Sequence, residues 1–317
     1  MYHVAGETQL RVVDRYLRQP ENAPLFERTR LVILEHILPT TFEFVRLLQS
    51  RGVEIAALIA KPYSVHEETF TRFVRELGIQ PVRFADYAEL EASGHIEQSV
   101  TNALEKSVLD GRRVVLVDVG GYFAPSLTRL SAEQTKHLAG VIEDTTFGHK
   151  IYEKRCQEIP VPICSVARSN LKEIEARFVG RDAVVAMENL LRKIGISITG
   201  RNALVIGYGM IGKNVAWTLK SYGLNVYVYD IQDRKLLEAF NDGFHVHKKS
   251  ILLRDADIIF SATGSEAEYG RSAMSLSEIE DCKHGVILAS VGSRDTEFAF
   301  RDLVSHAGSG EELIAGD

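Results

Sequence analysis

Residues 203–212 read ALVIGYGMIG, in which four apolar residues lead into the glycine pattern G-x-G-x-x-G. A helix-forming run follows over residues 213–222, and a β-rich run occupies residues 225–229. A strand, a glycine turn, a helix and a second strand in this order are typical of a parallel βαβ unit that binds a dinucleotide. The stretch therefore predicts a doubly wound α/β fold, with helices on both faces of a parallel sheet, for the part of the chain around it.

The three glycines and a later aspartate have separate roles in such a unit. Gly207 permits the tight turn, Gly209 lets backbone N–H groups approach a pyrophosphate, and Gly212 lets the helix pack close to the strand. Asp230 lies 18 residues after Gly212 (230 − 212), where it can accept hydrogen bonds from a ribose 2′-hydroxyl. Because its carboxylate would repel a 2′-phosphate, the sequence predicts NAD rather than NADP. The predicted cofactor loop consists of Gly207, Gly209, Met210, Ile211 and Gly212.

Two later apolar runs extend this domain, at residues 258–260 and 286–289, and each ends in small polar residues. Ligands of parallel sheets bind outside the carboxyl ends of the strands. We therefore expect four strand-end residues to lie near the nicotinamide half of the cofactor: Thr263, Gly264, Ser290 and Gly292.

The first half of the chain also alternates β-rich runs with helical patterns, which predicts a second doubly wound sheet. Its expected strands include residues 31–34, 53–59, 81–84 and 113–118. The fold class is thus α/β with two doubly wound parallel-sheet domains, the second a Rossmann domain. The expected organisation is a substrate-binding domain at 1–165, a hinge and linker helix at 166–199, the NAD-binding domain at 200–298 and a C-terminal tail at 299–317.

Composition and charge exclude several classes of binding partner. The chain has 317 residues, a net charge of -6 and no Lys/Arg block that could follow a phosphate backbone, so we expect no nucleic acid partner. Its apolar runs fall far short of the roughly 20 residues that a membrane-spanning helix needs. The start of the chain lacks the features of a signal peptide, and the three irregularly spaced cysteines are typical of free thiols, so we expect a cytoplasmic protein. No set of metal ligands is predicted.

Beyond the glycine loop, short segments spread over residues 31–297 resemble motifs of the S-adenosylhomocysteine hydrolase family. The loop at 207–213 is similar to that family's G-Y-G-x-V-G-K, and Ser290–Glu297 is similar to its N-I-G-H-F-D-x-E. The remaining matches are Leu34–Ile37 to C-L-H-M, Asp118–Gly121 to D-D-G-G, Asp144–Thr146 to E-T-T-T, Ser169–Lys172 to S-V-T-K and Ala262–Gly264 to T-T-G.

The resemblance implies a chemistry in which NAD oxidises a nucleoside 3′-hydroxyl to a ketone. The ketone acidifies C4′–H, the 5′ substituent leaves, water adds and the ketone is reduced again. His36 would then be the general acid/base at the 4′/5′ end, Lys172 would assist 3′-hydroxyl deprotonation and Asp144 would orient the ribose. Thr145 and Thr146 would reach the cofactor. We expect a small-molecule nucleoside substrate and a homo-oligomer, a dimer or tetramer.

The sequence departs from the family pattern at several pocket positions. Val119 and Tyr122 replace two carboxylates, and Ala176, beside Glu175, stands where an aspartate would support the lysine. Further departures are Leu38, Thr40, Ser293 and the absence of the family's C-terminal segment after Asp317. These differences indicate a divergent member that acts on a substrate other than S-adenosylhomocysteine.

Other interpretations remain open. Taken alone, His36 also fits a strand-end histidine with satisfied hydrogen bonds, and Lys172 fits a solvated lysine in a mixed-charge run. The loss of pocket carboxylates is also typical of a catalytically inactive homologue that binds NAD or a nucleoside and regulates a partner. A dehydrogenase for a small hydroxy acid would need an arginine and a histidine together in the cofactor domain, and no clear pair is present.

Overall fold

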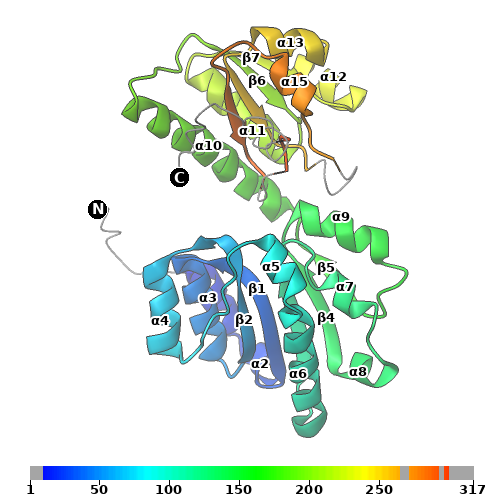
Figure 1. The fold of residues 1–317 in the computed structure, drawn as a ribbon. Coiled ribbons are helices and arrows are strands. Elements are labelled where there is room, and N and C mark those ends of the chain that lie inside the picture. The colour runs from blue at the N-terminus through cyan, green and yellow to red at the C-terminus, as the bar shows by residue number, and fades with distance from the viewer. Residues whose placement is uncertain (1–9, 265–270, 293–295, 300–317) are drawn as a thin grey trace. The chain divides into compact units, whose positions relative to one another are not determined.

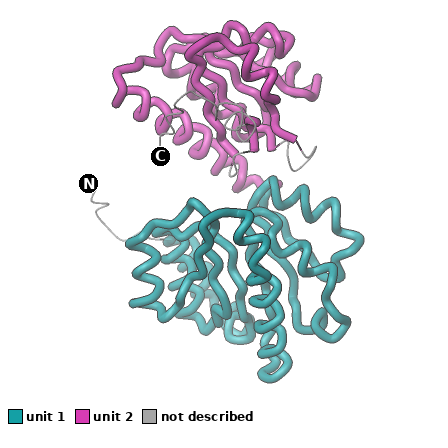
Figure 2. The backbone as a smooth tube through the Cα atoms, viewed as in Figure 1, with its two compact units in different colours: residues 1–167 teal, residues 168–317 magenta. Residues whose placement is uncertain are grey.

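The computed structural model describes residues 10–264, 271–292 and 296–299. The chain divides into two compact units, residues 1–167 and 168–317 (Figures 1 and 2). Each unit contains a five-stranded sheet whose strand pairs are parallel, with helices on both faces. The predicted fold class, α/β with two doubly wound sheets, is therefore confirmed. Within the described residues, no helix combines the length and apolar character needed to cross a membrane.

The sheet of the first unit has the order β2-β1-β3-β4-β5. In such an order the chain reverses its direction of winding between β1 and β3, and ligands of doubly wound sheets bind at that switch point, beyond the carboxyl ends of the strands. The strands are β1 (Thr29–Ile37), β2 (Glu54–Val65), β3 (Arg113–Asp118), β4 (Leu138–Glu143) and β5 (Ile163–Ser165).

Alternate side chains of β1 enter two separate cores, which is why helices cover both faces of this sheet. Leu31 and Ile33 pack against α1, α3 and α4, whereas Val32 and Leu34 pack on the side of α5, α6, α7 and α9. The helices are α1 (Arg11–Leu17), α2 (Ala23–Glu27), α3 (Pro39–Gln49), α4 (Glu67–Leu77), α5 (Tyr87–Ala92), α6 (His95–Asp110), α7 (Ala124–Leu127), α8 (Ala132–His137) and α9 (Thr146–Arg155).

The strand expected at residues 81–84 is reduced to a single bridge. Only Val82 pairs with the sheet, opposite Ile59 of β2. The Val82 N–H donates a hydrogen bond to the Leu58 carbonyl, and the Val82 carbonyl accepts one from Ala60 N–H. Pro81 has no N–H to donate, so the pairing does not extend toward the start of the segment.

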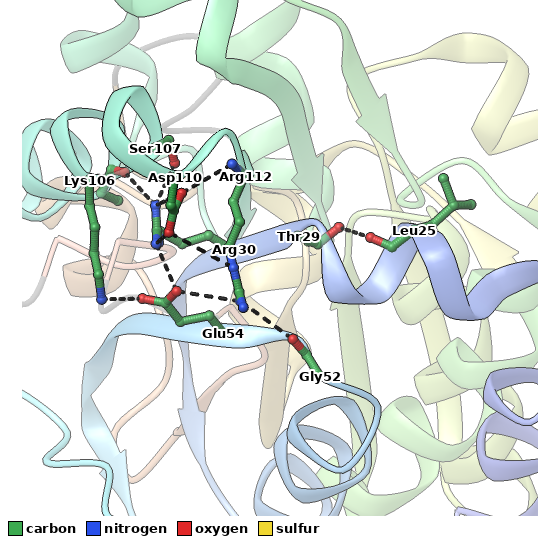
Figure 3. Close-up of polar contacts among 10 residues, drawn as sticks. Leu25, Thr29, Arg30, Gly52, Glu54, Lys106, Ser107, Asp110 and Arg112 are labelled. Carbon is green, nitrogen blue, oxygen red and sulfur yellow. Dashed lines mark hydrogen bonds and ion pairs between the residues drawn. The ribbon is translucent and has the colours of Figure 1, made fainter.

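A buried ion cluster ties together the amino ends of β1 and β2 (Figure 3). The guanidinium of Arg30 is fully buried and bonds Glu54 at 2.7 Å and Asp110 at 2.6 Å. It also donates to the Ser107 hydroxyl at 2.7 Å. A buried charge of this kind is tolerated because it is paired on several sides. The cluster lies at the strand ends opposite the ligand-binding edge, so we assign it a structural role.

The sheet of the second unit has the order β10-β9-β6-β7-β8, in which winding reverses between β6 and β9. The strands are β6 (Asn202–Ile206), β7 (Asn225–Tyr229), β8 (His245–Val246), β9 (Ile258–Ser261) and β10 (Ile287–Ser290). The helices are α10 (Asn170–Lys193), α11 (Met210–Ser221), α12 (Asp233–Asn241), α13 (Lys249–Asp255) and α15 (Leu276–Glu280).

The long helix α10 packs against α11 of the second unit. At Gly180 a Cβ atom would lie 2.7 Å from the Cβ of Asn214, so the close crossing depends on glycine there. Val184 and Leu191 enter the same core as Val205 of β6. The hinge role expected for residues 166–199 stays a prediction, and residues 300–317 of the expected tail lie outside the described residues.

Candidate active site

A bulge in β2 faces His36 at the end of β1. Glu35 pairs with Ala60 and Ile37 with Val65, so β2 takes five steps (60 to 65) where β1 takes two (35 to 37). The three extra residues push Ser64 toward the histidine, and its Oγ lies 2.6 Å from His36 Nδ1. Bulges of this kind re-aim side chains and are common beside active sites. His36 is therefore a half-buried, oriented imidazole at the carboxyl edge of the sheet.

The loop after β3 is held by the carboxylate of Glu143, the last residue of β4. Gly120 N–H and Gly121 N–H donate to the two Glu143 oxygens at 3.2 and 3.0 Å. The Thr145 N–H and hydroxyl also donate to Oε1, at 2.6 and 2.7 Å. A Cβ on Gly148 would lie 2.2 Å from the Glu143 carboxyl carbon, so α9 begins directly against this carboxylate. Glu143 thus fixes the ends of β3 and β4 relative to each other.

A second buried carboxyl, Asp118, lies beside Glu143. Asp118 accepts hydrogen bonds from Phe123 N–H at 3.0 Å and from the Tyr152 hydroxyl at 2.7 Å. Burial raises the pKa of Asp118, and the nearby buried ammonium of Lys61 opposes that rise. Burial, followed by repulsion from Asp118, raises the pKa of Glu143 to about 8. The pair therefore holds a proton that ordinary carboxyl groups would have released at neutral pH.

Asp144, Thr145 and Thr146 stand where β4 passes into α9. The half-buried Asp144 is fixed through its backbone N–H, which donates to the Asp118 carbonyl at 3.0 Å. Thr145 caps α9, because its hydroxyl accepts from Gly148 N–H at 2.9 Å. Thr146 is the first residue of the helix. His36 and Asp144 therefore share the carboxyl edge of one sheet, with β3 between their strands.

Lys172 belongs to the second unit, in the first turn of α10. Its backbone N–H is capped by the Ser169 hydroxyl at 3.3 Å, and its Nζ lies 2.5 Å from Glu175 Oε2. Ala176, where the family motif has an aspartate, is buried against the core. A carboxylate thus accompanies the lysine from the neighbouring position, on the exposed side of the helix.

The glycine loop has the close contacts that a dinucleotide site requires. A Cβ on Gly212 would lie 1.8 Å from the Gly207 carbonyl oxygen, and Gly207 itself has φ +94°. By contrast, a Cβ on Gly209 would meet nothing within 4 Å among the described residues. The space before Gly209, at the start of α11, is where a pyrophosphate would approach the backbone N–H groups. Gly209, Met210, Ile211 and Gly212 form the end of the helix that faces this space.

Asp230 joins this loop from the end of β7. Its Oδ2 accepts from Tyr208 N–H at 2.7 Å and its Oδ1 from Gln232 N–H at 2.9 Å. The buried Tyr208 ring is anchored at its other end, where its hydroxyl donates to Asp242 at 2.7 Å. Lys213 Nζ contacts the same carboxylate at 2.8 Å and lowers the pKa of Asp242. These contacts hold the turn between Gly207 and Gly209. We call the three residues that make them, Tyr208, Asp242 and Lys213, the loop brace.

Glu297 organises the turn that follows β9. This buried carboxylate accepts hydrogen bonds from the Ser261 hydroxyl at 2.6 Å, the Thr263 hydroxyl at 2.7 Å and Gly264 N–H at 2.8 Å. At the end of β10, the buried Ser290 Oγ has no hydrogen-bond partner among the described residues. A buried hydroxyl without a partner at this strand end could form a hydrogen bond with the polar nicotinamide expected there. Gly292 follows as an exposed bend, and Ser293 lies outside the described residues.

Several residues of these sites were not predicted from the sequence. Ser64 and Lys61 depend on a register shift between strands, which no local motif records. Glu143 and Glu297 act across 22–23 and 33–36 residues respectively. The sequence signal for Glu297 was its place as the last residue of a family motif. The signal for Glu143 was its position directly before Asp144.

Comparison with known proteins finds relatives that cover most of the chain. Residues 177–314 match the model for the NAD-binding domain of S-adenosyl-L-homocysteine hydrolase. S-inosyl-L-homocysteine hydrolase from Methanopyrus kandleri is 27% identical over 278 residues, covering 86% of this chain and 61% of the relative. Adenosylhomocysteinase from Thermoplasma volcanium is 26% identical over 285 residues, covering 89% of this chain and 66% of the relative.

The second unit thus matches the NAD-binding domain of S-adenosylhomocysteine hydrolases, and most of the chain is similar to members of that family. The cofactor of its second unit is therefore NAD, as the glycine loop predicted. The chain spans less than two thirds of the length of the two hydrolases above. Among solved structures, a dipicolinate synthase polypeptide from Bacillus halodurans has a similar fold, with a TM-score of 0.56 at 14% identity over 92% of this chain and 91% of that one.

Proposed function

We propose that this chain is an NAD-dependent enzyme that oxidises a ribose 3′-hydroxyl of a nucleoside and thereby enables elimination or addition at C4′–C5′. The observation that carries the proposal is the oriented His36–Ser64 pair at the carboxyl edge of the first sheet, beside its switch point. The three-residue bulge in the adjacent strand brings Ser64 to this histidine, and bulges are common beside active sites. Bound NAD supplies the oxidising capacity for the alcohol, and the protein side chains handle protons.

The proton steps divide between two side chains, and a third orients the sugar. Lys172, oriented by Glu175, accepts the 3′-hydroxyl proton through the neutral form of its amine. His36 moves protons at C4′ and C5′ through Nε2, while Ser64 holds Nδ1. A histidine suits that role because its ordinary pKa lies near neutrality. Asp144 accepts a hydrogen bond from a ribose hydroxyl and so orients the sugar. The Thr145 hydroxyl already serves Glu143 and Gly148, so of the two threonines Thr146 is the better candidate to contact the cofactor.

The substrate is a nucleoside other than S-adenosylhomocysteine. The buried side chains of Val119 and Tyr122 stand where the family motif has carboxylates. Without these partners, hydroxyl or ammonium groups of S-adenosylhomocysteine would be buried unpaired, at about 1–3 kcal/mol each. Hydrolysis of S-adenosylhomocysteine should therefore be weak or absent, as assayed by adenosine release. Turnover at rates ordinary for an enzyme would overturn the substrate assignment but leave the chemistry in place.

A second function is favoured by the same replacements. A family member whose pocket carboxylates are gone could bind NAD or a nucleoside without catalysis and regulate a partner. The observation that supports this regulatory function is the buried Val119, which cannot act as a carboxylate would. The oriented His36 and the Lys172–Glu175 pair favour the enzyme, because a regulator has no need of either. Mass spectrometry of small molecules that copurify with the protein distinguishes the two: oxidised sugar or elimination products indicate turnover, and an unaltered nucleoside indicates a regulator.

A further inference from the structure

Three tyrosines form a continuous aromatic array at the carboxyl edge of the first sheet. The rings of Tyr63 and Tyr87 meet edge to face with centroids 5.9 Å apart. The rings of Tyr87 and Tyr122 lie 6.1 Å apart and nearly parallel, at 8°. Tyr63 comes from the β2 bulge, Tyr87 from the start of α5 and Tyr122 from the loop after β3. The array thus spans three segments that end at the same edge.

The array is continuous with the proposed catalytic histidine. Tyr63 is followed directly by Ser64, whose hydroxyl contacts His36 Nδ1. At the other end, the Tyr122 ring lies over Gly120, where a Cβ would approach within 2.7 Å of it. Gly120 is in turn fixed by Glu143. Tyr63 is therefore the exposed end of the array, next in the chain to the partner of His36, while Tyr87 and the buried Tyr122 support it from the core.

The conformation of Tyr63 argues against a purely structural role. Its φ is +61°, and it is the single non-glycine residue of the described chain with a positive φ. A bulky residue in this region is strained, whereas glycine adopts it without cost. The side chain is 78% exposed, so its burial contributes little to folding. Strain of this kind persists at functional sites, where a side chain must be held in a particular place.

We propose that Tyr63, Tyr87 and Tyr122 form a subsite for a planar, uncharged ring of the substrate. Phenol rings offer π-faces and hydroxyl groups but no formal charge, so they suit a flat ring better than a zwitterionic amino-acid tail. Tyr122 stands where the family motif has a carboxylate, and its stacking on Tyr87 replaces a polar contact with an aromatic one. The inference rests on the proposed nucleoside chemistry and names the group that this enzyme would accept.

The ring could be the nucleobase or an aromatic 5′ substituent, and three probes distinguish these sources. Isothermal titration calorimetry on the NAD-loaded protein would use adenosine, 5′-methylthioadenosine and 5′-phenylthioadenosine. We expect Tyr63→Ala to weaken binding roughly 5- to 100-fold, the range typical of a lost stacking partner. If the base occupies the subsite, Tyr63→Ala should bind all three probes more weakly than wild type does. If the 5′ substituent occupies it, only the affinity for the phenylthio compound should fall.

Matched variants separate this role from a structural one. Tyr63→Phe keeps the ring and should keep the affinity. Tyr63→Gly relieves the strained backbone, so this variant should unfold no more easily than wild type. It should still bind the probes weakly, because the ring is gone. Tyr16→Ala, at an exposed tyrosine of α1, should change nothing. Probe affinities that are equal in wild type and Tyr63→Ala would overturn this inference alone. If none of the probes binds the NAD-loaded wild type, the proposed function fails and this inference fails with it.

Discussion

The Nδ1 atom of His36 lies 2.6 Å from the Oγ atom of Ser64 across the bulge of β2. A serine hydroxyl both donates and accepts, so it can hold the imidazole in its neutral and its protonated form. A group that gives and takes protons in successive steps requires this property. Ser64 is therefore a positioning residue for His36, and the pair yields a first prediction.

We expect His36→Asn to leave the initial oxidation of a nucleoside intact but to block elimination. Reduced enzyme should then accumulate, with the later step slowed on the order of 10²–10⁴-fold, the usual contribution of a positioned acid/base. Ser64→Ala should slow the same step less and alter its pH profile. Rapid-mixing absorbance of NADH follows both steps. A His36→Asn protein that turns over like wild type would remove His36 from the mechanism.

Lys172 and Glu175 should act at the first step. Lys172→Met should abolish NADH formation, because the proposal assigns acceptance of the 3′-hydroxyl proton to the Lys172 amine. Glu175→Gln removes the charge 2.5 Å from Nζ, so it should slow this step and shift its pH dependence. The neighbouring exposed glutamate provides the control: Glu173→Gln should behave as wild type. Equal effects of the two glutamine variants would indicate a general loss of surface charge instead.

The loop brace should contribute to the affinity for NAD. Tyr208→Phe removes the hydroxyl that bonds Asp242, and the turn between Gly207 and Gly209 becomes less constrained. We expect the dissociation constant for NAD to rise about tenfold, with a loss of about 1 kcal/mol in the free energy of unfolding of the cofactor-free protein. Calorimetry measures both. Tyr227→Phe, whose ring packs against His245, is the control. An NAD affinity that falls no further than in that control would contradict this role.

The Asp118–Glu143 pair predicts a pH dependence of stability. The pKa of Glu143 is raised to about 8 in the folded protein, so between roughly pH 4.5 and 8 the folded state binds more protons than the unfolded state. The free energy of unfolding should therefore fall as the pH rises through this window. Asp118→Asn removes the neighbouring charge, lowers the pKa of Glu143 and should flatten the decline. Urea unfolding at several pH values tests this, and an unchanged slope in Asp118→Asn would contradict the coupling.

The parts of the molecule that local chemistry dictates were predictable from the sequence. Gly207 and Gly212 tolerate no side chain, and the alternation of Leu31 to Leu34 between two cores is typical of a strand covered on both faces. The fold class and the NAD loop follow from such patterns. The expected strand at residues 81–84 was wrong in extent, because pairing there depends on a partner strand that the local sequence does not reveal.

The network around the predicted residues arises from long-range geometry. The bulge that carries Tyr63 and Ser64 exists only in the pairing of β2 with β1. Glu143 holds a loop that precedes it by 22–23 residues, and Tyr208 reaches Asp242 across 34 residues. Such contacts are created by the fold, so His36 could be named from a motif while the groups that orient it could not.

The central claim is tested most directly by a single turnover. NAD-loaded protein in excess is mixed with adenosine, and the absorbance of NADH is followed in wild type, Lys172→Met and His36→Asn, with bound NAD verified in each. The account predicts rapid reduction in wild type, none in Lys172→Met, and reduction that persists in His36→Asn. Absence of NADH in all three proteins, with adenosine and with every other nucleoside tried, would contradict the account and favour a regulator that binds without catalysis.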